Sequence, residues 1–444
     1  MFRRTDSLGA SRIAEAALAV LLAGVILAVI AAIVTPEYAT PAAGTLALLA
    51  GCAGVFLVRR GQRIVSCVLA IIGITALAAA WSLGVEYSPV GLLSLNQDLI
   101  GMLAAVSLMG TAITPIERVS GRLTGTAAVW RTAAFLHLLG GIINLSALSI
   151  IGDRLKGSTG LHRGDALLLT RVYTTAAFWS PFWVGSAAAS ALAPGANLWV
   201  VLVVGFTLAC VTIAATMPST LCALGESRRD YVGYPISWVL MRVPLLLVLA
   251  VMALHLALPA VPVPRLVTLV SLIVFLVATL RRAGRRAFLA DCFRTSVAAL
   301  PGTRGETVLF VGAGLLGIGL SALLKTVEWT IPLPGYGALE AWGGVVIMTV
   351  VSLLGIHPLV SMSLVAALIG PLNPEPTLFV SSAIIAWGLS AASGPISGIQ
   401  MFMQGRYGVS PLETTRGNIG FLLTGLALTG PALFTVGWWA QSVK

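Results

Sequence analysis

Two short polar stretches interrupt segments that are otherwise almost wholly apolar. One lies in LLGGIINLSALSIIG (138–152) and the other in LLGIHPLVS (353–361). Their amide, hydroxyl and imidazole groups can bind an ion or a small solute, and a histidine can also carry a proton near neutral pH. The candidate contacts in these stretches are Asn144, Ser146, Ser149, His357, Ser361 and Ser363.

A proline interrupts each of two further apolar segments, FWSPFWVG (178–185) and SAASGPISGIQ (390–400). Proline removes a backbone donor and clashes with the carbonyl four residues earlier, so Pro181 and Pro395 each predict a helix split into two halves. Half-helix N-termini favour anions, and unwound carbonyls can hold a small cation. The candidate contacts here are Ser180, Ser393, Gly394, Ser397 and Gln400.

The composition shows which elements must position these residues. Of 444 residues, 58% are hydrophobic and 10% are charged, and the mean hydropathy is +0.97. This balance excludes a water-soluble protein, and apolar blocks of about 20 residues predict membrane-spanning helices instead of barrel strands. The five cysteines lack metal-ligand spacing, so we expect them to be small buried hydrophobes.

The apolar blocks predict eleven transmembrane helices, the first of them an uncleaved helix and not a signal peptide. Two further apolar stretches, 127–152 and 339–370, do not fit this count. The predicted spans are 13–34, 43–58, 64–83, 99–115, 166–191, 197–217, 236–258, 264–280, 306–324, 377–403 and 417–437.

The positive charges predict the sidedness of these spans, because Lys and Arg collect in cytoplasmic loops. With the N-terminus inside and the C-terminus outside, 24 of the 27 Lys and Arg residues lie inside. The exceptions are Arg265, Lys325 and Lys444. The net charge of +11 therefore does not indicate nucleic-acid binding. The arginine-rich segment 281–304 is expected to lie on the anionic inner leaflet.

The same charges explain the two stretches that do not fit. Arginines inside the cell flank 127–152 on both sides, and about 26 residues are too few for two crossings. This stretch is therefore predicted to be a re-entrant hairpin. Glu328, Glu340 and Glu375 flank 339–370, which predicts a second hairpin that enters from the opposite face.

An internal repeat relates the two halves of the chain. An offset of 214 residues places Leu139, Gly141 and Pro181 on Leu353, Gly355 and Pro395, although only 7 of 43 positions are identical. Each half has three spans, a hairpin, a broken span and a final span. The hairpin does not cross the membrane, so each half crosses it five times, and this odd number predicts inverted-topology repeats. The predicted parts are an N-terminal helix (1–36), scaffold segments (37–123 and 218–326) and transport segments (124–217 and 327–444).

In this layout the chain resembles the ion-transporter superfamily, in particular the divalent anion/sodium symporters and their arsenite-exporter and sodium/proton-antiporter relatives. The resemblance covers about 43–437 and implies a homodimer in which the hairpins and broken helices move as an elevator-type block. It also implies that substrate and coupling ion bind at the hairpin tips and helix breaks. The symporters have Ser-Asn-Thr at each tip, whereas this chain has Asn144-Leu145-Ser146 and His357-Pro358-Leu359.

Several candidates also allow a purely structural role. Asn144 and Ser146 can cap the second helix of their hairpin, and His357 can be neutral and bonded locally. His137 is expected to be a packed, satisfied histidine. Arg171 is expected to snorkel to the interface or pair with Asp165, with a gate for an anionic substrate as the functional alternative. The glycines of VGAGLLGIG (311–319) are expected to allow close helix packing.

The sequence thus predicts an all-α integral membrane protein of the inner membrane that acts as a secondary active transporter. We expect a small solute, with an anion favoured, a proton or sodium gradient as the energy source, and no other cofactor or bound metal. An ion antiporter or an oxyanion exporter is the alternative. A membrane-embedded enzyme is disfavoured, because neither H-E-x-x-H nor G-x-S-x-G occurs.

Overall fold

All regular structure in the described part of the chain is helical, as expected from the sequence. The structure is a computed structural model that describes residues 2–86, 93, 96–112, 123–143, 145–157, 160–233, 238–326 and 333–442. Within these ranges seven helical segments are long and apolar enough to cross a membrane. Four further apolar helices are shorter, including both arms of the second predicted hairpin. The chain is a multi-pass helical membrane protein.

The chain folds into two compact units, and two of the boundaries between them fall within α11 (Trp238–Ala257) and α15 (Pro358–Ile369). Unit 1 comprises Met1–Thr114, Ala250–Ile331 and Ala366–Gly370. Unit 2 comprises Pro115–Leu249, Pro332–Val365 and Pro371–Lys444. Every candidate site residue except Asn144 and Ser146 has a described side chain, and all of these lie in unit 2.

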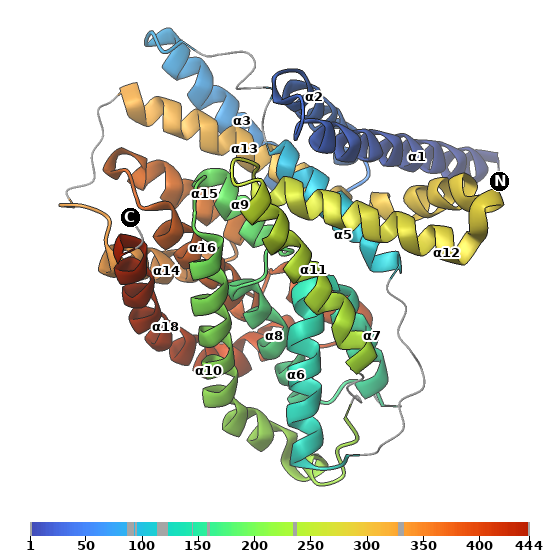
Figure 1. Cartoon of the computed structure of the whole chain (residues 1–444), viewed down its shortest axis with the longest axis vertical. Coiled ribbons are helices and arrows are strands. Elements are labelled where there is room, and N and C mark those ends of the chain that lie inside the picture. The colour runs from blue at the N-terminus through green and yellow to red at the C-terminus, as the bar shows by residue number, and fades with distance from the viewer. Residues whose placement is uncertain are drawn as a thin grey trace. The chain divides into compact units, whose positions relative to one another are not determined.

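Unit 1 is a bundle of long helices (Figure 1). Its most extensive pairings join α3 to α13 and α5 to α12. The 214-residue offset of the predicted repeat places α3 on α12 and α5 on α13, so the repeat maps each pair onto the other. The helices are α1 (Phe2–Ala31), α2 (Pro36–Val55), α3 (Arg60–Ser82), α5 (Gln97–Ala112), α12 (Val263–Ala299) and α13 (Arg304–Thr326). Glycines let α3 and α13 approach closely: a Cβ at Gly312 would lie 2.6 Å from the Ser66 carbonyl oxygen, and one at Gly319 would collide with that of Gly73. The expected packing role of these glycines is confirmed.

Unit 2 repeats one order of elements: two helices that follow one another closely in the chain, a broken helix and a long helix. The first set is α6 (Thr126–Ile143), α7 (Leu145–Leu155), α8 (Arg163–Thr174), the 3-10 helix η1 (Thr175–Phe178), α9 (Val184–Leu192) and α10 (Leu198–Leu224). The second set is α14 (Ala338–Leu353), α15, α16 (Pro376–Ser393), α17 (Gly398–Tyr407) and α18 (Pro411–Ser442). Short 3-10 turns follow α10, α12 and α15.

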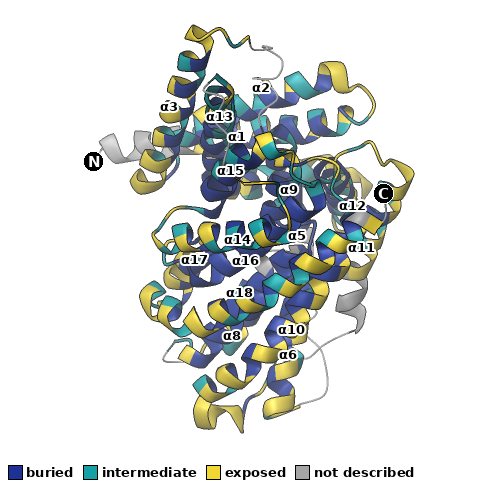
Figure 2. Cartoon of the chain, turned by 90° about the vertical axis from the view of Figure 1, so that its left-hand side faces the viewer, coloured by how far each residue is buried: buried dark blue, intermediate teal, exposed yellow. Residues whose placement is uncertain are grey.

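Helix α16 forms the centre of unit 2. Every side chain from Thr377 to Ser393 is buried, and Figure 2 shows this helix in dark blue behind its neighbours. It packs against α14, α18, η1 and α9. Polar groups on such a helix meet neither water nor lipid, so each needs a partner within the protein or from a bound species.

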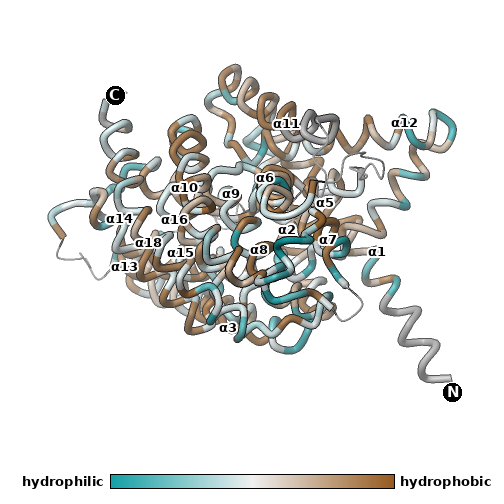
Figure 3. Tube along the Cα trace, turned by 90° about the horizontal axis from the view of Figure 1, so that it is seen from below, coloured by the Kyte–Doolittle hydropathy of each residue, from teal (hydrophilic) through white to brown (hydrophobic). Residues whose placement is uncertain are grey.

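Many large apolar side chains are exposed on both units, and the tube in Figure 3 is brown along many of the helices. One sequence expectation is wrong on this point. Cys52, Cys210 and Cys222 are exposed and not buried. In a bilayer an outward thiol meets hydrocarbon instead of water, so a small apolar residue is no less suited to the surface than to the interior.

Candidate functional site

The first helix break, residues 179–183 with Pro181 at its centre, is joined by hydrogen bonds to the end of α6. The Ser180 hydroxyl donates to the carbonyl of Gly141, and the Trp183 indole N–H donates to the carbonyl of Gly140 at 2.9 Å. Both carbonyls belong to the last turn of α6, where no intrahelical donor remains for them. The first break therefore caps the first arm of the first helical pair.

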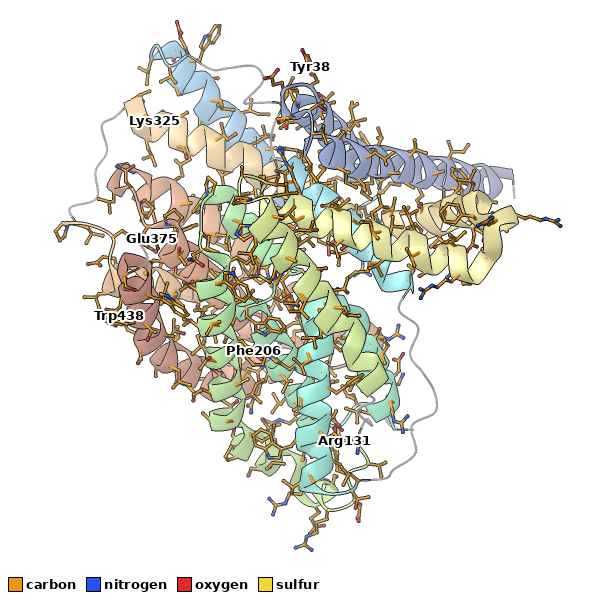
Figure 4. All side chains as sticks on the ribbon, viewed as in Figure 1. Tyr38, Arg131, Phe206, Lys325, Glu375 and Trp438 are labelled. Carbon is orange, nitrogen blue, oxygen red and sulfur yellow. The ribbon has the colours of Figure 1, made fainter. Side chains whose placement is uncertain are left out.

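Other polar groups at the first break are also occupied. The Ser180 hydroxyl accepts from the Phe182 N–H at 3.2 Å, and the Ser186 hydroxyl donates to the Ser180 carbonyl at 2.6 Å. His137 is buried and accepts a hydrogen bond from the Trp179 indole at 3.0 Å. Phe206, labelled in Figure 4, contacts both of these rings. The expectation that His137 is a packed, satisfied histidine is confirmed. The hydroxyl protons of Ser180 and Ser186 are both donated within the protein.

The second break, residues 394–397, separates α16 from α17 and exposes carbonyls that a continuous helix would satisfy. Side chains occupy two of them. Ser397 donates to the Ala391 carbonyl at 2.7 Å, and Gln400 and Asn418 each donate to the Ala392 carbonyl at 2.7 Å. The sequence suggested that unwound carbonyls could hold a cation, but these two already accept hydrogen bonds from side chains.

Three other polar atoms at the second break have no hydrogen-bond partner among the described residues. They are the hydroxyls of Ser390 and Ser393 and the amide oxygen of Gln400, and the three side chains are at most 1% exposed. Ser390 and Ser393 are three residues apart on the last turn of α16, so they share a face. The Gln400 amide nitrogen donates to the carbonyl of Ala392, the residue that precedes Ser393 in the chain. Leaving such groups unpaired costs about 1–3 kcal/mol each, so a water molecule or a solute that bonded to them would stabilise this part of the fold.

The turn between α14 and α15 lies against the second break. Gly355, in the turn, has a φ of +96°, and a Cβ there would lie 3.0 Å from Ile396. A Cβ at Gly394 would lie 2.9 Å from the Ser352 hydroxyl. His357 accepts from the Leu359 N–H at 3.2 Å. This is the local hydrogen bond expected if the histidine has a structural role.

Trp387 on α16 connects this turn to the first broken helix. Its ring lies edge-on to His357 with centroids 5.4 Å apart, and a Cβ at Gly185 in α9 would lie 2.7 Å from it. A Cβ at Gly388 would lie 2.6 Å from the Thr174 carbonyl oxygen. The two breaks thus belong to one packed cluster. Trp387 was not a sequence candidate, because a tryptophan in an apolar span carries no signal of its own.

Arg171 does not snorkel to the membrane surface, and the expectation that it does is wrong. Its side chain is buried and donates to Asn418, Ser219 and Thr220 at 2.7–2.9 Å and to the Gly417 carbonyl at 2.7 Å. Within the described residues it forms no ion pair with a carboxylate. Snorkelling fails because α10 and α18 supply enough acceptors to hold the guanidinium inside.

The remaining candidates have local roles or cannot be placed. Asn144 lies outside the described residues, and the side chain of Ser146 is not described. The Ser149 carbonyl accepts from Tyr407 at 3.2 Å, and the Ser361 hydroxyl donates to the Pro358 carbonyl at 2.9 Å. Ser363 is buried in α15.

An ion pair joins the end of α7 to the end of α17. Arg406 donates from Nε to Asp153 Oδ1 at 2.9 Å and from Nη2 to Asp153 Oδ2 at 2.5 Å. The Tyr407 hydroxyl donates to Asp153 at 3.0 Å. Gly152 lies directly under Tyr407, so a Cβ there would collide with the phenol. The Arg406 guanidinium holds the pKa of Asp153 below its ordinary value of 3.8.

This shift predicts a pH dependence. Because the folded-state pKa is lowered, the stabilisation is complete above the unfolded-state pKa and is lost as pH falls through the folded-state value. Both side chains are about half exposed, so the contribution is at most about 1 kcal/mol. We expect Asp153→Asn to melt slightly below wild type at pH 7 and together with it only at a pH well below 3.8. A constant difference at both pH values, or an additive further loss in Arg406→Gln, would contradict the pairing.

Comparison with known proteins identifies the fold. No protein-family model matches the chain, and no curated protein matches it significantly. Among solved structures, the fold is that of a membrane transporter. The Alcanivorax borkumensis YdaH transporter, whose crystal structure reveals an unusual topology, matches with a TM-score of 0.53 at 14% identity. The match covers 85% of this chain and 98% of that one.

Proposed function

We propose that this protein is a secondary active transporter that moves a small anionic solute across the cytoplasmic membrane, driven by a proton or sodium gradient. The observation that carries the proposal is the set of three unpartnered atoms at the second break, on Ser390, Ser393 and Gln400. Two hydroxyls can donate to a solute, and the amide oxygen can accept from it or ligate a cation. The likeness to a solved transporter supports the same conclusion.

Two fixed positive features favour an anion at this break. Helix α17 begins at the break, with Ser397 as its N-cap. The N-terminus of a helix favours negative charge. Arg171 is linked to the same break through Asn418, which accepts from the arginine at 2.9 Å and donates to Ala392 at 2.7 Å. No carboxylate neutralises this guanidinium among the described residues. An anionic solute would compensate its charge.

The transport cycle that we propose is elevator-like. Unit 2 contains both breaks, the first helical pair and the second pair apart from the end of α15, so it is the candidate moving block. Unit 1 is the candidate scaffold and dimer-forming part. His357 is the candidate proton carrier, because it lies in the turn beside the second break and beside Trp387. The proposed orientation has the N-terminus in the cytoplasm and the C-terminus outside.

Transport by reconstituted protein tests the proposal. Proteoliposomes are loaded with the purified protein and assayed with radiolabelled carboxylates, sulfonates and oxyanions, each with a sodium gradient, a proton gradient or neither. We expect one class of anion to accumulate only when a gradient is imposed, and Ser393→Ala to abolish its uptake. Accumulation of no anion in any condition, or uptake that persists in Ser393→Ala, would overturn the proposal.

A further inference from the structure

Helix α12 folds back on itself at Gly284 and forms a basic helical hairpin, defined here as residues 281–299. Gly284 has φ +69° and ψ 171° inside an otherwise continuous helix, a backbone conformation that favours glycine. The two arms are tied together across the bend. Arg282 before it donates to Asp291 after it at 2.7 Å and to Thr295 at 3.5 Å.

The charges of this hairpin fall into two groups. Arg282 and Arg294 both bind Asp291, which neutralises part of their charge. Arg281, Arg285 and Arg286 are exposed and form no hydrogen bond or ion pair with any described residue. Three guanidinium groups are therefore available to an external anion at the bend, which is hydrophilic between apolar stretches of α12 in Figure 3.

Apolar side chains accompany these free arginines. Leu289 is 78% exposed and Phe293 is 64% exposed. The four-residue spacing places Leu289 on the same face as Arg285 and Phe293. A helix face with arginines at one end and bare large apolar residues at the other fits the boundary between lipid headgroups and acyl chains. It fits a soluble acidic partner less well, because water would then cover Leu289 and Phe293.

We propose that the basic hairpin is a binding surface for anionic phospholipid headgroups, with Arg281, Arg285 and Arg286 as the headgroup ligands and Leu289 and Phe293 inserted beneath them. The partner is the lipid itself, not free phosphate, because only a lipid supplies both the anionic group and the hydrocarbon. The proposal is independent of the transported solute, since it concerns unit 1 and the second break lies in unit 2.

Lipid titration of the purified full-length protein tests this surface. Melting temperature in neutral detergent is followed as phosphatidylglycerol, phosphatidylcholine or inorganic phosphate is added. We expect only phosphatidylglycerol to stabilise wild type. The variant R281Q/R285Q/R286Q should melt normally without lipid and need about tenfold more phosphatidylglycerol, or higher, for the same stabilisation, because each basic residue contributes to attraction by an anionic surface.

The matched control removes two other exposed arginines, R228Q/R229Q, which lie at the end of the short 3-10 helix after α10 in unit 2. This control should keep the wild-type response. A second variant, L289S/F293S, should reduce the protection of 281–299 from hydrogen exchange in nanodiscs that contain phosphatidylglycerol. An unchanged titration in the triple variant, an equal loss in R228Q/R229Q, or full stabilisation by inorganic phosphate would overturn the proposal.

Discussion

Replacing Arg171 with leucine is expected to lower the free energy of unfolding by roughly 3–5 kcal/mol, because hydrogen bonds to a charged group are worth about 1.5–3 kcal/mol each and their acceptors would stay buried. The acceptors left without a donor include Asn418 and the Gly417 carbonyl. The Asn418 amide would also lose the bond that orients its nitrogen toward Ala392. The loss should therefore reach the second break.

Two further variants separate the charge of Arg171 from its geometry. Arg171→Lys keeps the charge but cannot reproduce the fork of donors, so we expect reduced stability with anion binding partly retained. Arg171→Gln removes the charge, and we expect anion binding to be lost. Arg228→Leu, at an exposed site in the 3-10 helix η2 (Gly225–Arg228), is the control and should change stability by no more than about 0.5 kcal/mol. A wild-type melting temperature for Arg171→Leu would contradict the assigned role.

The second large effect is expected at the contact between α3 and α13. Gly319→Ala would place a methyl group against the Gly73 carbonyl oxygen, and a Cβ at Gly73 would in turn collide with the backbone at Leu315. Backbone cannot yield as a flexible side chain does, so the helices must separate. We expect a loss of about 3 kcal/mol, at the upper end of the usual cost of overpacking.

Gly61→Ala is the matched control for this contact. Gly61 lies in the first turn of α3, and a Cβ there meets nothing within 4 Å. The substitution should be neutral or slightly stabilising, because alanine has the higher helix propensity. Thermal unfolding of both variants in detergent gives the comparison. Equal melting temperatures for the two alanine variants would show that α3 and α13 do not pack as described.

The sequence predicted that the protein is helical and where two of its helices are interrupted. Pro181 and Pro395 each lie in a non-helical segment between two shorter helices, and proline chemistry is local enough to be seen in one dimension. The close contacts at Gly312 and Gly319 were also foreseeable, because small residues at helical spacing in an apolar segment have few other uses.

The difference between the two breaks could not be predicted. Ser180 and Ser393 both stand beside a Pro-containing interruption, yet Ser180 is bonded to Gly141 and Ser393 is unpartnered among the described residues. The sequence gives no means of knowing which donors reach a given carbonyl across the fold. Arg171 shows the same limit, since its partner Asn418 is 247 residues away. Hydrophobic periodicity predicts which residues lie on a helix, but it does not predict which residues of other helices they contact.

The central claim is that the second break holds the solute and that the first break is structural. The most direct measurement compares Ser393→Ala with Ser180→Ala by melting temperature, with and without a saturating concentration of the transported anion. We predict that Ser393→Ala melts at or above the wild-type temperature without the anion, because it removes an unpartnered buried hydroxyl, and that the anion does not stabilise it. Ser180→Ala should melt at a lower temperature without the anion, because it loses the bond to Gly141, and should still be stabilised. The reverse pattern, with anion stabilisation lost in Ser180→Ala and kept in Ser393→Ala, would contradict the account.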